Sequence, residues 1–139
     1  MTAKEFLSEY QNCERRIIAK IEKISEYKEM AKSISIRFKE KVQTTKQANG
    51  TEKIICMYMD MQLNLYKDVA DLKSRLEKIT KTINKIQDNT QKEVLERKYI
   101  NLDSFSKIAE KMFISERQIF RIHGKALENI QKIIDKWAK

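Results

Sequence analysis

One seam of apolar side chains constrains the fold of this chain more than any other feature. Between residues 54 and 86, apolar residues recur at steps of three or four, at Ile54, Tyr58, Met61, Leu65, Val69, Leu72, Leu76, Ile79, Ile83 and Ile86. This spacing places all of them on one face of a helix and continues over about four heptads. Because so long an apolar face must be buried, the seam predicts a long helix with at least one partner helix.

A second seam precedes the first along the chain. It consists of Phe6, Tyr10, Cys13, Ile17, Ile21, Ile24, Ala31 and Ile34, again at helical spacing. Residues 37–53 between the seams are polar and contain Asn49 and Gly50, a common turn pair. We therefore expect residues 1–87 to form a long antiparallel helical hairpin, coiled-coil-like, joined by a flexible loop over 37–53. This hairpin is expected to act as a spacer or oligomerisation element that makes the protein a homodimer through its N-terminal helices.

The composition supports a helical protein and narrows its chemistry. The chain has 139 residues with no proline, two glycines and a formal net charge of +9. This composition favours an all-α fold and a polyanionic partner, either nucleic acid or an anionic membrane surface. One histidine and two cysteines are too few for a zinc site or a disulfide scaffold. No glycine-rich phosphate loop and no paired-carboxylate motif occurs. We therefore expect no enzymatic activity, no cofactor and no metal ion, and we expect free thiols at Cys13 and Cys56.

The start of the chain lacks the apolar core of a secretory signal, and no apolar run approaches the ~18 residues that a membrane span needs. These two features predict a soluble, cytoplasmic protein with no membrane partner.

Residues 88–139 are predicted to form a separate unit. The polar stretch DNTQ at 88–91 ends the long seam, and KEVLERKYIN begins a new amphipathic helix. Ser104 is a candidate N-cap for a short helix whose inward residues are Phe105, Ile108, Ala109 and Met112. Ser115 and Gln118 fit a capping box for a last, basic helix, with Ile114 and Ile119 at the positions of a hydrophobic staple. A helix, a tight turn and a second helix predict a helix-turn-helix unit.

Residues 92–130 resemble region 4 of bacterial sigma factors, and the whole chain is similar to small phage and prophage regulators of the RinA and ArpU type. The resemblance implies transcriptional control of phage or prophage genes in a bacterial host and allows a contact with host RNA polymerase. It implies that the last helix binds double-stranded DNA in the major groove, with a phosphate contact at Ser115, base contacts at Glu116, Arg117, Gln118 and Arg121, and a backbone contact at Lys125.

Two residues depart from the pattern of sigma factors. Phe113 occupies the turn, where glycine is frequent, and would store strain of ~1 kcal/mol if positive φ is required there. Phe120 stands where sigma factors tend to have a basic residue, and it could contact a thymine methyl group or another protein. His123 is expected to lie near the side of the last helix and to have a packing role.

Two other functions fit the same order of elements. Small terminase subunits of phages also join a helix-turn-helix to coiled-coil helices, although their DNA-binding unit commonly comes first. The third possibility is a coiled-coil adaptor whose C-terminal unit binds protein instead of DNA.

Overall fold

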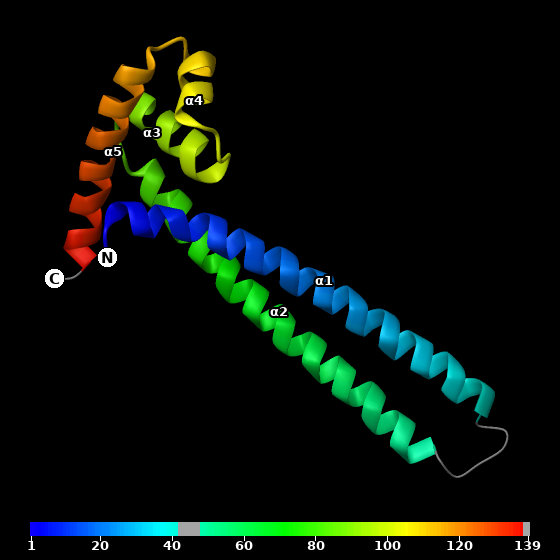
Figure 1. Cartoon of the computed structure of the whole chain (residues 1–139). Helices are drawn as coiled ribbons and strands as arrows, with labels where there is room; N and C mark the ends of the chain where they lie inside the picture. Colours follow the sequence, from blue (N-terminus) through cyan, green and yellow to red (C-terminus); the bar gives the residue numbers. More distant parts are fainter. Residues whose placement is uncertain (42–47, 138–139) are drawn as a thin grey trace. The chain divides into compact units, whose positions relative to one another are not determined.

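The structure is a computed structural model that describes residues 1–41 and 48–137. These residues form α1 (Ala3–Lys41), α2 (Ala48–Asn84), α3 (Asn89–Leu95), the π-helical turn η1 (Glu96–Ile100), α4 (Phe105–Met112) and α5 (Glu116–Trp137) (Figure 1). No strand occurs within the described ranges, so the predicted all-α class is confirmed. The chain divides into two compact units, unit 1 with Met1–Glu14 and Ser74–Lys139, and unit 2 with Arg15–Lys73.

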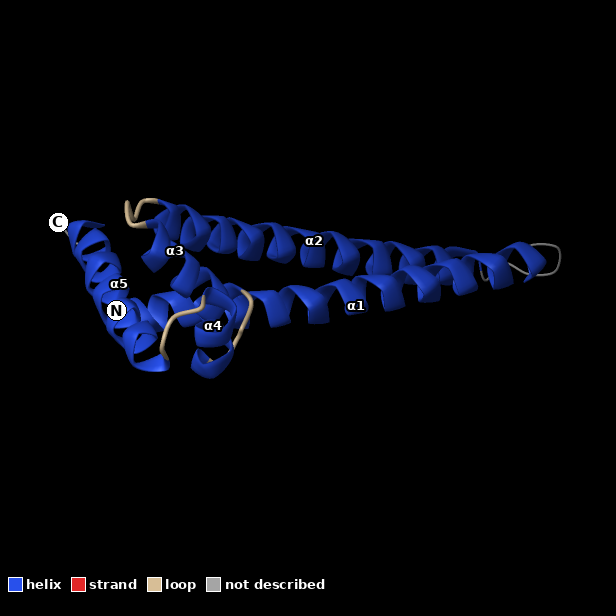
Figure 2. Cartoon of the chain, turned by 90° about the horizontal axis from the view of Figure 1, so that it is seen from above, coloured by secondary structure: helices blue, strands red, loops and turns tan. Residues whose placement is uncertain are grey.

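Unit 2 contains the parts of α1 and α2 that run antiparallel to each other (Figure 2). Lys20 Nζ lies 3.1 Å from Asp68 Oδ2, and the ring centroids of Tyr27 and Tyr58 are 5.7 Å apart. Residues 20 and 27 on α1 therefore face residues 68 and 58 on α2, which is the order expected for antiparallel helices. The seam side chains that this pairing buries in unit 2 are Ile17, Ile24, Val69 and Leu72.

Three predicted seam residues are exposed instead. Ile21 keeps 50% of its accessible surface, Ile54 43% and Met61 38%. Two helices bury only the strip between them, so apolar residues at the flanks of each seam stay in contact with solvent. Their predicted burial is therefore wrong for the single chain.

Both ends of the stretch 37–53, predicted as a loop, are helical instead. α1 continues to Lys41 and α2 begins at Ala48, so Asn49 and Gly50 lie in the first turn of α2 and not in a connecting turn. No proline interrupts either helix, and one glycine near a helix end costs too little to stop it. Residues 42–47 lie outside the described residues.

Unit 1 has a core assembled from four parts of the chain. Its buried members come from the start of α1, the end of α2 with the turn that follows it, the α3–η1 segment and α5: Ala3, Phe6, Leu7, Ile79, Ile83, Ile86, Leu95, Tyr99, Ala126, Ile130 and Ile134. Hydrogen bonds join the same parts, from Ala3 N to Gln131 Oε1 at 2.7 Å and from Asn129 Nδ2 to Gln91 Oε1 at 2.7 Å. The compact units are thus not divided at residue 88. A spacer role for 1–87 and a DNA-binding role for 88–139 stay predictions.

Cys13 is fully buried, whereas Cys56 is exposed. Neither forms a disulfide, in agreement with the expected free thiols.

Candidate nucleic-acid interface

A second buried cluster holds α3, α4 and α5 together. Val94, Ile108 and Ile119 are each fully buried and supply one side chain from each helix. The partly buried residues around them are Phe105, Ala109, Met112, Ile114 and Ile122. The inward residues predicted for α4 are therefore confirmed, and this cluster fixes α4 against the first half of α5.

The turn between α4 and α5 is built on a left-handed residue. Phe113 has φ 57° and ψ 37°, and its N–H donates to the carbonyl of Ala109. Ile114 N also donates to Ala109 O, at 3.1 Å, which closes the turn. The Phe113 side chain is 94% exposed, so no packing offsets the strain of roughly 1 kcal/mol that a side chain adds in this conformation. The condition for strain at this turn, a positive φ at Phe113, is therefore met.

Side-chain caps define the starts of both helices. Ser104 Oγ accepts from Lys107 N at 3.2 Å, and Ser115 Oγ accepts from Gln118 N at 3.3 Å. Each bond satisfies one of the N–H groups that the first turn of a helix leaves without an intrahelical partner. The two predicted caps are confirmed, and the one at Ser115 sets where α5 begins.

The predicted DNA-contacting residues are all exposed. They are Ser115, Glu116, Arg117, Gln118, Phe120, Arg121 and Lys125. At ~100° per residue, Arg117, Gln118, Arg121 and Lys125 share one side of α5 within about 100° of arc, opposite the buried Ile119. Within the described parts of the chain, none of the cationic side chains of Arg117, Arg121 and Lys125 forms an ion pair. We name Arg117, Gln118, Arg121 and Lys125 the basic face.

Phe120 lies at the edge of this face and is 51% exposed. Its ring centroid is 4.6 Å from that of Phe105, at the start of α4. One side of the ring therefore packs within unit 1 while the other remains accessible. This packing was not anticipated, because it depends on how α4 lies against α5.

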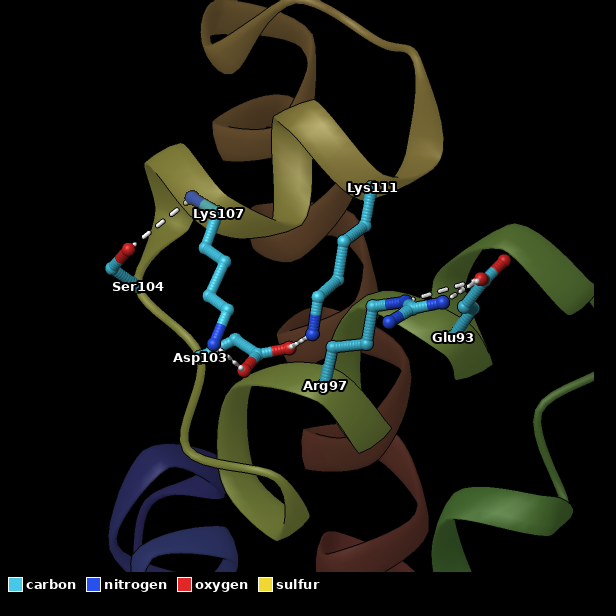
Figure 3. Close-up of polar contacts among 6 residues, drawn as sticks. All are labelled: Glu93, Arg97, Asp103, Ser104, Lys107 and Lys111. Carbon is cyan, nitrogen blue, oxygen red and sulfur yellow. Dashed lines mark hydrogen bonds and ion pairs between the residues drawn. The ribbon is translucent and has the colours of Figure 1, made fainter.

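A buried carboxylate positions α4. Asp103 is 7% exposed, and its carboxylate lies 3.1 Å from Lys111 Nζ and 3.7 Å from Lys107 Nζ (Figure 3). The hydrogen bond from Lys111, with the charges of Lys111, Lys107 and Arg97, holds the pKa of Asp103 below its ordinary 3.8. Both lysines belong to α4, so Asp103 ties that helix to the loop before it. Sequence reasoning missed this contact, although lysines at i+4 and i+8 from an aspartate were a usable signal.

An aromatic group surrounds the only histidine. The hydroxyl of Tyr99 lies 2.8 Å from His123 Nε2, and the ring centroids of His123 and Phe105 are 5.0 Å apart. Burial, followed by the charges of Lys98 and Lys4, lowers the pKa of His123 below 6.5. Burial raises the pKa of Tyr99 above 10.0. His123, on α5, thus has the expected packing role and also forms a hydrogen bond to Tyr99 of η1.

Comparisons of the chain with family models, curated proteins and solved structures found no match. Within residues 1–41 and 48–137, no helix is both long and apolar enough to cross a membrane. In the same residues, no three His, Cys, Asp or Glu side chains are grouped so that they could hold a metal ion.

Proposed function

We propose that this protein is a sequence-specific transcriptional regulator of phage or prophage genes, which places the basic face of α5 in the major groove of double-stranded DNA. The observation that carries the proposal is the exposure of Arg117, Gln118, Arg121 and Lys125 on one side of a capped helix whose other side is anchored by Ile119. In this proposal the protein acts in the cytoplasm of a bacterial host and also contacts host RNA polymerase.

The residue types suit major-groove recognition. Arginine donates a bidentate pair of hydrogen bonds to guanine O6 and N7, and glutamine makes a similar pair with adenine. Lysine supplies a charge to the DNA backbone without reading sequence. Arg117, Gln118 and Arg121 therefore read bases in our proposal, and Lys125 binds phosphate. Ser115 and Glu116, at the start of α5, lie beside them: Ser115 contacts phosphate and Glu116 accepts from a base amino group.

We further propose that unit 2 makes the protein a homodimer. Met59, Leu63 and Tyr66 follow one another at steps of four and three along α2 and are 55%, 58% and 46% exposed. They form a second apolar stripe outside the α1–α2 seam, which we name the outer stripe. In our proposal a second copy of α2 buries this stripe, because steps of four and three residues are the spacing by which helices pair in a coiled coil. Dimerisation would present two basic faces to a palindromic operator.

The proposal is tested by measuring binding to a selected operator and to scrambled DNA at several salt concentrations. Arg117→Ala and Arg121→Ala are expected to weaken operator binding by about tenfold to a hundredfold and to leave scrambled DNA nearly unaffected, because each removes ~1–3 kcal/mol of base discrimination. Lys125→Ala is expected to weaken binding to both DNAs and to lower the salt slope by about one.

Lys132→Ala is the matched control. Lys132 is also exposed on α5 but lies ~10 Å further along the helix than Lys125. Lys132→Ala should change neither the affinity for the operator nor the affinity for scrambled DNA. Circular dichroism checks that every variant is folded. Equal losses on both DNAs in the arginine variants would rule out base recognition by α5, and unchanged affinity in all variants would rule out DNA binding by the basic face.

A further inference from the structure

A cleft of about 640 Å³ opens in unit 1 beside the aromatic group. It lies between the first turns of α1, the η1 segment and the starts of α4 and α5, and Lys4, Lys98, Tyr99, Phe105, Phe120 and His123 are among the residues that line it. Its size falls within the range of roughly 300–1,000 Å³ typical of small-molecule sites. The proposed DNA contacts of the basic face do not use this cleft.

The apolar part of the cleft is aromatic. Phe105 packs against Phe120 at 4.6 Å and against His123 at 5.0 Å between ring centroids, with the His123 and Tyr99 rings stacked at 5.8 Å. Phe120 is 51% exposed and Leu102, which also lines the cleft, is 49% exposed. A planar ring can therefore contact aromatic surface that the fold leaves uncovered, and aromatic pairs of this kind add to simple burial.

The polar part of the cleft is positively charged. Lys98 Nζ lies 4.2 Å from the centre of the Phe105 ring, so its neighbour is the face of an aromatic ring and not a carboxylate. Lys4 is exposed, and no described residue that lines the cleft is acidic. The Ser8 and Gln11 side chains, which also line it, add hydrogen-bonding groups. The two lysines also lower the pKa of His123, so their positive field extends into the cleft.

We propose that this cleft binds a small organic anion that carries an aromatic ring, with the ring against Phe105, Phe120 and His123 and the anionic group on Lys98 and Lys4. A carboxylate on a planar ring matches both halves of the site. The cleft is distinct from the basic face, because none of Arg117, Gln118, Arg121 and Lys125 lines it, whereas Phe120, at the edge of that face, does.

The test is an amide NMR titration of the full chain with indole-3-acetate, and with indole-3-ethanol as the neutral analogue of the same shape. Indole-3-acetate is expected to bind with a dissociation constant of about 1 mM, given its size. Shifts should concentrate on the cleft residues Lys98, Leu102, Phe120 and His123. The alcohol should bind about tenfold more weakly, because it cannot use the lysines.

Variants separate the two halves of the site. Lys98→Met should weaken the acid about tenfold and leave the alcohol unchanged, whereas Phe120→Ala should weaken both. Lys132→Met, remote from the cleft, should change neither. The amide spectrum also reports whether each variant is folded. If Lys98→Met unfolds, Lys4→Met, at an exposed position, takes its place.

Several outcomes would overturn the inference. One is the absence of shifts with indole-3-acetate at about ten times the expected dissociation constant, and another is a set of shifts scattered over the surface. The inference would also fail if the acid and the alcohol bound with equal affinity, or if neither lysine variant changed the affinity for the acid. None of these results depends on whether the protein binds DNA, so failure here leaves the DNA proposal standing.

Discussion

Tyr99 Oη lies 2.8 Å from His123 Nε2, so a single hydrogen bond joins the π-helical turn η1 to α5. His123 is half-buried beside Tyr99 and Phe105. This burial, followed by the charges of Lys98 and Lys4, disfavours its positive form. The neutral imidazole therefore belongs to the folded state. Burial and the two lysines lower the pKa of His123, and the stability of unit 1 therefore depends on pH.

We predict that the protein loses stability as the pH falls below 6.5. The folded-state pKa of His123 is below its ordinary 6.5, so the unfolded chain binds a proton more readily and protonation favours unfolding. The stability that depends on neutral His123 is fully present above pH 6.5 and is lost as the pH falls toward the folded-state pKa of His123. The measurement is the urea midpoint at pH values of about 7.5 and about 5.5. His123 is the only histidine, so His123→Gln should flatten the difference; an equal drop in the variant would assign the effect to carboxylates.

Replacing Phe113 by glycine should stabilise the protein. Phe113 has φ 57° and an exposed side chain, so Phe113→Gly relieves strain and loses little packing. We expect a gain of up to ~1 kcal/mol in the free energy of unfolding, read from urea denaturation. Phe113→Ala is the control, because it removes the same ring but keeps a Cβ at positive φ. A gain from alanine as large as that from glycine would show that the exposed ring, and not the backbone, causes the effect.

Gly124→Ala should also stabilise the protein. Gly124 lies in the middle of α5, and a Cβ there would meet no atom within 4 Å. Alanine is favoured over glycine in helix interiors by about 0.8–1.0 kcal/mol, so the melting temperature should rise by a few degrees. Gly50 has equally open surroundings but lies in the first turn of α2, where the gain should be smaller. Destabilisation by Gly124→Ala would show that this part of α5 is not helical in solution.

A charge in the outer stripe should weaken the proposed dimer. Leu63→Lys places an ammonium group in the middle of Met59, Leu63 and Tyr66, and burying it without a partner is unfavourable. Light scattering with size-exclusion chromatography at high micromolar concentration should show a dimer for the wild type and a monomer for Leu63→Lys. Asn64→Lys adds the same charge one residue away, outside the stripe, and should remain dimeric. A monomeric wild type would refute dimerisation through unit 2.

The elements of this fold could be predicted because their signals are local. The caps at Ser104 and Ser115, the inward residues of α4 and the position of the turn at Phe113 depend only on residues a few positions apart. The seams likewise predicted α1 and α2. Helix starts and apolar periodicity can be recognised in a short stretch of sequence, without knowledge of the rest of the chain.

Contacts between distant segments could not be predicted in this way. Leu7 lies outside the predicted seam but is fully buried, because in unit 1 the start of α1 meets residues from α2, η1 and α5. Ile21, within the seam, is exposed because unit 2 offers only one partner helix. The cleft beside His123 likewise combines Lys4 with Lys98 and Phe120. A periodic pattern identifies an apolar face but does not say how many surfaces will cover it.

The hydrogen bond between Ala3 N and Gln131 Oε1 spans 128 positions of the chain and has a consequence for the order of folding. On the ribosome, Phe6 and Leu7 are synthesised long before Ala126 and Ile130, the residues of α5 that share their core. Until then these apolar side chains have no native cover from α5, and they are available to chaperones or to misfolded contacts. Closing so long a loop also slows folding. Unit 2 consists of residues 15–73 and can form early, whereas unit 1 is completed only after α5 has been made.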